Sequence, residues 1–186
     1  MAVDLPSELD PDCVPLAWLL GRWEGNGHGD YPTIEPFSFG QEIVFSQDGR
    51  PFLHYFSRTW LVDEEQRPLR PSALETGFFR PGTRGELEVV LAHHSGFVEI
   101  WYGTVDGAKI EMRTDAVART SSAKEYTAGH RLYGLVEGDL MWAFDMAAVG
   151  QPLQSHTWGR LRRAADDQLH ASEPPRRAAN EAPKAT

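Results

Sequence analysis

The sequence predicts an all-β protein built as a closed antiparallel barrel. Three observations support this fold class. Apolar residues alternate with a period of two over most of the chain, turn dipeptides separate the alternating segments, and no helical pattern is long enough to cover a sheet. Roughly nine or ten strands joined by short turns must be antiparallel, and so large a sheet either splits into a sandwich or closes. Closure removes exposed strand edges, so we favour the barrel.

The first part of the chain precedes this strand pattern. Residues 1–10 are polar and contain proline, so we expect them to be mobile. Residues 11–20 (PDCVPLAWLL) form a short apolar segment that ends before Gly21. This pattern indicates one or two helical turns that act as a cap. Cys13 is the only cysteine, so no intrachain disulfide can form.

The strands begin at Trp23. Residues 52–62 are rich in aromatic and β-branched types, and residues 97–105 end at a hairpin dipeptide, Asp106-Gly107. Two further segments place all their large apolar residues on one face. In residues 86–93 these are Leu87, Val89 and Leu91, and in residues 139–149 they are Leu140, Trp142, Phe144, Met146 and Ala148. This pattern predicts that both segments are strands with one buried face.

The strand count also predicts a cavity and sets the limits of the domain. Roughly eight strands already leave space for a small ligand, so a barrel of ten is too wide for side chains alone to fill. After Arg163 the composition shifts, and residues 164–186 contain a single large apolar residue, Leu169. Such a segment cannot bury enough surface to become ordered, so we expect a disordered tail. Residues 11–163 then form one barrel domain.

The overall charge restricts the partners. The chain of 186 residues has a net charge of −9, which disfavours general binding to nucleic acid or to anionic membranes. Its acidic start lacks the basic and apolar regions of a signal peptide, and no apolar stretch is long enough to span a bilayer. We therefore expect a cytoplasmic protein without nucleic-acid or membrane partners.

A stretch near the start of the first strand is as rich in glycine as a phosphate-binding loop. Residues 25–29 read Gly-Asn-Gly-His-Gly, but no helical pattern follows them. A phosphate cradle needs the N-terminus of that following helix, so we reject a nucleotide site. These glycines instead allow neighbouring backbone or a ligand to come close and allow a strand to bend.

The histidines are the main candidates for chemistry, and most have a simple interpretation. His93 and His94 precede Ser95-Gly96, so we expect one or both of them to be solvated at a turn. His54 and His130 lie within strands beside polar residues, which favours surface or packing roles. The histidine spacings match no zinc site, which requires three or four protein ligands.

His156 differs in its context. It lies in LQSHTWGRLRR, the last strand before the tail, and Trp158 is expected on the same face of that strand. A single imidazole that faces an apolar cavity suits an iron ligand in a haem protein. Spacing alone, however, favours a hydrogen-bonded core or rim histidine over a ligand.

Three stretches in order resemble the nitrobindin family. The first is Gly21-Arg22-Trp23-Glu24-Gly25-Asn26-Gly27, which matches the family's GxWxGxG signature through Gly21, Trp23, Gly25 and Gly27 and is followed by Tyr31-Pro32-Thr33-Ile34. The second is Glu75-Thr76-Gly77-Phe78-Phe79-Arg80-Pro81. The third runs from Ala123-Lys124-Glu125 through Met146 and Gln151-Pro152 to His156. Together they extend from about residue 14 to residue 163.

This resemblance implies a fold, a cofactor and an activity. The fold is a ten-stranded antiparallel barrel similar to fatty-acid-binding proteins and lipocalins. The cofactor is haem b, one per chain and held non-covalently, and the absence of a CxxCH motif agrees with this attachment. His156 is then the axial iron ligand and the catalytic residue, while Thr33 lies near the haem and Lys124 pairs with a propionate.

The implied activity is the isomerisation of peroxynitrite to nitrate at ferric iron, with nitric oxide bound when the iron is ferrous. The resemblance also implies a homodimer. One alternative is a haem-free carrier of a lipid or other apolar small ligand in the same cavity. Another is a nitric oxide sensor or carrier in which isomerase activity is incidental.

One position departs from the family pattern. Family members often carry a histidine two residues before the glutamate of the second stretch, and this chain has Ala73 there. A hydrogen-bond donor on the distal side of the haem is therefore missing or replaced, with His54 or a water molecule as candidate replacements. We expect this side to be more apolar than usual.

Overall fold

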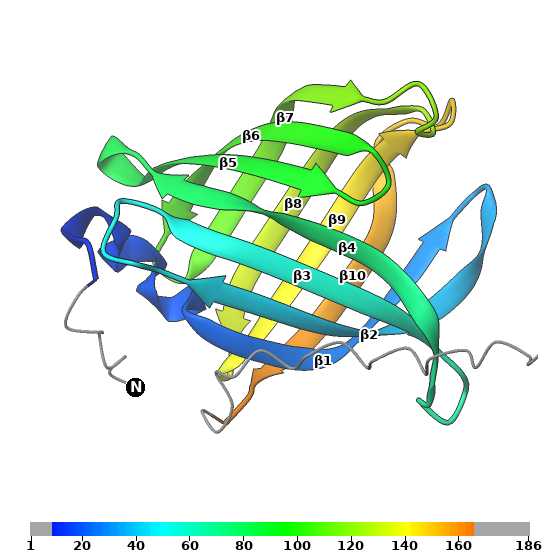
Figure 1. Ribbon diagram of the computed structural model, residues 1–186, viewed down its shortest axis with the longest axis horizontal. Helices are drawn as coiled ribbons and strands as arrows, with labels where there is room; N and C mark the ends of the chain where they lie inside the picture. Colours follow the sequence, from blue (N-terminus) through cyan, green and yellow to red (C-terminus); the bar gives the residue numbers. More distant parts are fainter. Residues whose placement is uncertain (1–8, 166–186) are drawn as a thin grey trace, which may run out of the picture.

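A computed structural model describes residues 9–165 of the chain. They form a closed barrel of ten antiparallel strands in the order β1-β10-β9-β8-β7-β6-β5-β4-β3-β2, which confirms the predicted fold class (Figure 1). The expected mobile segment 1–10 and the expected tail 164–186 lie almost entirely outside the described residues. Within residues 9–165, no helix is both long enough and apolar enough to cross a membrane.

The elements follow one another along the chain with short connections. The 3₁₀ helices are η1 (Pro11–Leu19) and η2 (Thr83–Gly85). The first five strands are β1 (Gly21–Tyr31), β2 (Ile34–Ser46), β3 (Leu53–Val62), β4 (Pro68–Pro81) and β5 (Glu86–His93). The other five are β6 (Phe97–Asp106), β7 (Lys109–Arg119), β8 (Tyr126–Val136), β9 (Asp139–Ala148) and β10 (Gln154–Arg163).

The local patterns in the sequence account for these elements. The apolar face of β5 (Leu87, Val89 and Leu91) is fully buried, as expected. Gly107 has a positive φ of 56°, which the β6–β7 hairpin turn needs and glycine adopts without strain. The predicted helical cap is the helix η1, which Asp10 begins by accepting a hydrogen bond from the backbone N–H of Asp12.

The two ends of the barrel are covered differently. The helix η1 lies at one end, beside the start of β1, and the β1–β2 hairpin extends from the other end (Figure 1). At the η1 end, large apolar side chains fill the interior, and we call this the packed half. Its buried members include Leu16, Leu19, Trp23, Ile43, Phe45, Leu53, Tyr55, Phe79, Leu87, Val89, Leu91, Trp101, Ile110, Met112, Tyr133, Leu140 and Leu161.

The GxWxGxG residues shape the inner surface of β1. Trp23 is fully buried, and its indole N–H donates to the carbonyl oxygen of Leu19 at 2.7 Å, which ties η1 to the barrel. A Cβ atom added at Gly27 would lie 2.3 Å from the ring of Phe39. Glycine is therefore needed for that ring to pack against β1, which supports the structural interpretation of the glycine-rich stretch.

Candidate functional site

The end of the barrel opposite η1 contains two adjoining cavities, and we call this region the hollow half. The loop cavity, of about 290 Å³, is lined partly by turn and loop residues. The strand cavity, of about 220 Å³, is lined only by residues of strands. His93, Phe144 and His156 line both cavities. The predicted internal space therefore exists, and these three side chains stand where the two cavities meet.

A β-bulge directs His156 into these cavities. On β10, Ser155 pairs with Asp145 and Thr157 pairs with the adjacent Phe144, so His156 is the extra residue between them. A bulge of this kind interrupts the inward and outward alternation of a strand and re-aims a side chain. His156 consequently faces the cavities, whereas Trp158 is 43% exposed on the outer surface. The expectation that the two share a face was wrong, because it assumed an unbroken strand.

The immediate surroundings of His156 hold its ring in one orientation. The rings of Tyr31, Phe37 and Phe144 lie 5.2, 6.4 and 6.0 Å from the imidazole, all edge-on. Its Nδ1–H donates to the carbonyl oxygen of Asp30 at 3.2 Å. Burial lowers the pKa of His156, although this hydrogen bond opposes the effect. The imidazole is therefore neutral at pH 7, with the lone pair of Nε2 free to bind a metal ion.

The other two residues assigned to the haem by resemblance lie close to this histidine in space. Thr33 comes from the β1–β2 turn and Lys124 from the β7–β8 loop, and both line the loop cavity together with His156. Lys124 is exposed, so its ammonium group is at the rim rather than in the interior. The fold thus brings together three residues that are distant in the sequence.

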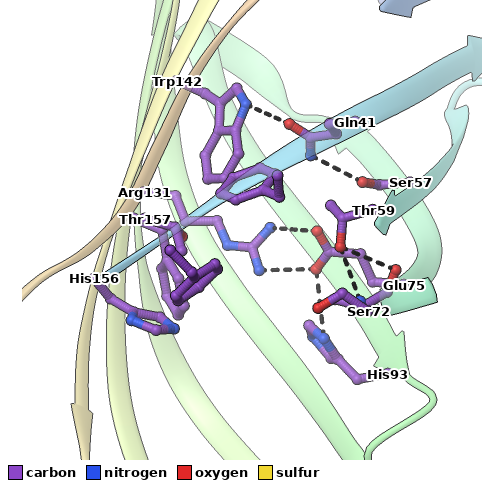
Figure 2. Close-up of a pocket in the computed structure, with 14 residues that line it drawn as sticks. Gln41, Ser57, Thr59, Ser72, Glu75, His93, Arg131, Trp142, His156 and Thr157 are labelled. Atoms are coloured by element: carbon purple, nitrogen blue, oxygen red, sulfur yellow. Dashed lines mark hydrogen bonds and ion pairs between the residues drawn. The ribbon is translucent and has the colours of Figure 1, made fainter. Parts of the chain in front are cut away.

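A buried ion pair forms part of the wall of the strand cavity. The guanidinium of Arg131 donates to both carboxylate oxygens of Glu75, at 2.8 and 3.2 Å (Figure 2). The hydroxyl of Tyr55 donates to the same carboxylate at 2.8 Å. Burial by itself would raise the pKa of Glu75, but Arg131, His93 and Tyr55 together lower it to about 2. Glu75 is therefore ionised at pH 7.

Sequence reasoning missed the role of Arg131. Its signal is nevertheless visible, because Arg131 lies between Gly129 and Tyr133 on the buried face of β8, where a charge is unexpected without a partner. The partner could not be identified in the same way, since Glu75 lies 56 residues away in the sequence.

His93 also faces the interior of the barrel. Its side chain is only 16% exposed, and its Nε2 lies 2.6 Å from a carboxylate oxygen of the buried Glu99. Although it is the last residue of β5, it continues the inward face of Leu87, Val89 and Leu91. This period of two outweighs the following turn at His93, so of the two histidines only His94 is exposed at the turn.

Two other histidines within strands, His54 and His130, have the predicted surface and packing roles. His54 is exposed on the outer face of β3 and contacts the hydroxyl of Thr76 at 3.0 Å. It is therefore no candidate to replace the histidine that the family resemblance would place at Ala73, because it lies outside the barrel. His130 is half-buried between Glu111 and Asp145.

Comparisons with known proteins agree with this geometry. A family model for the THAP4-like, heme-binding β-barrel domain matches residues 12–163. A peroxynitrite isomerase of Nocardioides sp. is 60% identical over 163 residues, covering 88% of this chain and 99% of that protein. A ferric nitrobindin-like protein of Cutibacterium acnes is 48% identical, covering 88% and 100%. The crystal structure of Rv2717c from M. tuberculosis superimposes with a TM-score of 0.77 at 41% identity, covering 84% and 99%.

Proposed function

This chain belongs to the THAP4-like, heme-binding β-barrel family, and we propose that it binds one haem b non-covalently through His156 and isomerises peroxynitrite to nitrate. The single observation that carries this proposal is the hydrogen bonding and placement of the His156 imidazole. Its Nδ1–H is engaged by a backbone carbonyl, which leaves the lone pair on Nε2, and its side chain lines both cavities. Histidines that bind metals commonly donate their other ring N–H in this way, which fixes the tautomer and the ring orientation.

The other side chains of the hollow half suit haem, which is flat, apolar over its ring and charged at its propionates. Aromatic and apolar side chains supply contact surface around His156, among them Phe37, Phe39, Phe144 and Met146. At the rim, Lys124 offers an ammonium group to a propionate carboxylate, and Thr33 offers a hydroxyl. Carboxylates would then lie near solvent and the apolar ring inside, which is the favourable partition for both.

The chemistry is divided between the cofactor and the chain. When bound, haem supplies the iron centre at which the O–O bond of peroxynitrite rearranges to nitrate. The chain would contribute a ring nitrogen of His156 as a ligand to that iron, a fixed orientation of the imidazole through its hydrogen bond to Asp30, and the walls of the cavity. When reduced, the bound haem would also supply a site for nitric oxide.

A haemin titration tests the proposal. We expect a Soret band that saturates at one haemin per chain and that is lost or strongly shifted in His156→Ala. The matched control is His54→Ala, because that imidazole lies on the outer face and its loss leaves the spectrum unchanged. Nitrate yield from peroxynitrite should rise with haem-loaded wild-type protein and not with His156→Ala.

Stability measurements separate loss of the ligand from loss of the fold. Removing the half-buried His156 side chain should change the unfolding free energy of the haem-free protein by no more than about 1 kcal/mol. An unchanged Soret band in His156→Ala would refute the ligand assignment. A colourless protein that ignores haemin but binds a fluorescent fatty acid would instead favour an apolar-ligand carrier.

A further inference from the structure

We propose that His93 is the hydrogen-bond donor for a small ligand on the wall that faces His156, with its Nδ1–H directed at a ligand oxygen atom. This rests on the proposed binding of haem by His156. It assigns to His93 the part that Ala73 cannot play, since an alanine side chain has no donor.

The strand order places His93 across the barrel from His156. His156 is on β10 and His93 on β5, and four strands separate β10 from β5 in either direction around the closed ring. The two strands are therefore diametrically opposed. Figure 2 shows the two imidazoles on opposite walls, with the Arg131–Glu75 ion pair above them in this view. A ligand held between the two walls would have one histidine on each side.

The direction of the His93 side chain follows from its strand. His93 occupies an inward position of β5 and lines both the strand cavity and the loop cavity. Its neighbour His94 is exposed, and its ring receives a hydrogen bond from the backbone N–H of Leu74. Of this pair, only His93 is therefore directed at the space beside His156.

Two carboxylates hold the ring of His93 in place. The contact of Nε2 with Glu99 is short, at 2.6 Å, and Glu99 is 1% exposed. Nδ1 lies 3.4 Å from the nearer oxygen of Glu75, which is long for a hydrogen bond. Glu75 already accepts hydrogen bonds from Tyr55 and Arg131. Glu99 therefore holds Nε2 tightly, whereas the contact of Nδ1 with Glu75 is loose, and Nδ1 is the ring nitrogen that a ligand can engage.

Infrared spectroscopy of the ferrous carbonyl form of the haem-loaded protein tests this assignment. A hydrogen bond to bound carbon monoxide lowers the C–O stretching frequency. We therefore expect the band to move to a higher wavenumber in His93→Leu and to lie between the two in His93→Gln, whose amide can still donate. The matched control is His54→Leu, which removes an imidazole from the outer face of the barrel and should leave the band in place.

A second measurement on the wild-type protein covers the case in which His93→Leu does not fold. In the ¹⁵N spectrum of labelled histidines in the ferric, haem-loaded protein, the Nδ1 signal of His93 should move when cyanide is added, and it should show a bound proton in the cyanide complex. An Nδ1 of His93 that carries no proton in the cyanide complex would overturn the proposal.

The outcomes also distinguish this proposal from the one on which it rests. A normal Soret band with no difference in the C–O band between wild type and His93→Leu would overturn the role of His93 and leave the haem assignment standing. A wild-type protein without a Soret band would overturn both.

Discussion

The packed half and the hollow half of the barrel are built from the same strands but filled differently. Along β5, inward positions carry Leu87, Val89 and Leu91 and then His93. Four neighbouring strands make the same change from large apolar to polar inward residues. The changes are from Ile43 to Gln41 on β2, from Tyr55 to Ser57 on β3, from Phe79 to Glu75 on β4, and from Trp101 to Glu99 on β6.

The difference shows how one barrel can combine stability with a binding site. Large apolar side chains stabilise the fold where they meet across the interior, and the helix η1 closes that end. At the other end, smaller and polar side chains leave space, and they would destabilise the protein if they were not hydrogen-bonded to one another. The hydrogen bonds from Trp142 to Gln41 and from Gln41 to Ser57, at 2.8 and 3.1 Å, meet this requirement.

The largest expected difference between the halves comes from removing one phenylalanine ring from each. Phe79 is fully buried against the rings of Phe45, Tyr55 and Tyr133, so Phe79→Ala should lower the unfolding free energy by about 3–5 kcal/mol. Phe37 lines the strand cavity, and Phe37→Ala should cost about 1 kcal/mol. Urea denaturation of the haem-free proteins measures both. Equal losses would show that the hollow half is packed as tightly as the other.

A comparable but more specific loss is expected from the ion pair at the boundary of the two halves. Arg131→Met leaves the Glu75 carboxylate buried without its main partner, which should cost about 3 kcal/mol. Adding Glu75→Gln to this variant should cost less than the sum of the two single changes. The exposed pair of Arg80 and Glu88 is the control, and Arg80→Met should cost less than about 1 kcal/mol. Additive effects at the buried pair would contradict a direct interaction.

The smallest effect is expected in how the unfolding free energy depends on pH. The pKa of Glu75 is lowered from 4.5 to about 2 in the folded protein, so its ionised form stabilises the fold above pH 4.5. That contribution should be lost as the pH falls from 4.5 towards 2. Denaturation at pH 5 and pH 3 should show a smaller decrease in Glu75→Gln than in wild type. Glu88→Gln, an exposed control, should retain the wild-type decrease.

Several residues of the site could be predicted from the sequence, and others could not. The motif residues Thr33, Lys124 and His156 could be selected by resemblance, and the structure places all three around one cavity. His93 could have been selected from its period of two with Leu91, but its turn dipeptide suggested solvent instead. Arg131 has a visible signal on β8, although its partner is remote.

By itself, the sequence determined the barrel, the faces of its strands and the internal space. These properties follow from a period of two and from turn residues, which act over a few neighbouring positions. The tertiary structure alone decided that a bulge directs His156 inward while Trp158 faces out, and that His93 meets Glu75 and Glu99 across from it. Strand register and contacts across the barrel exist only after the ring has closed, because they join residues with no local relation in the chain.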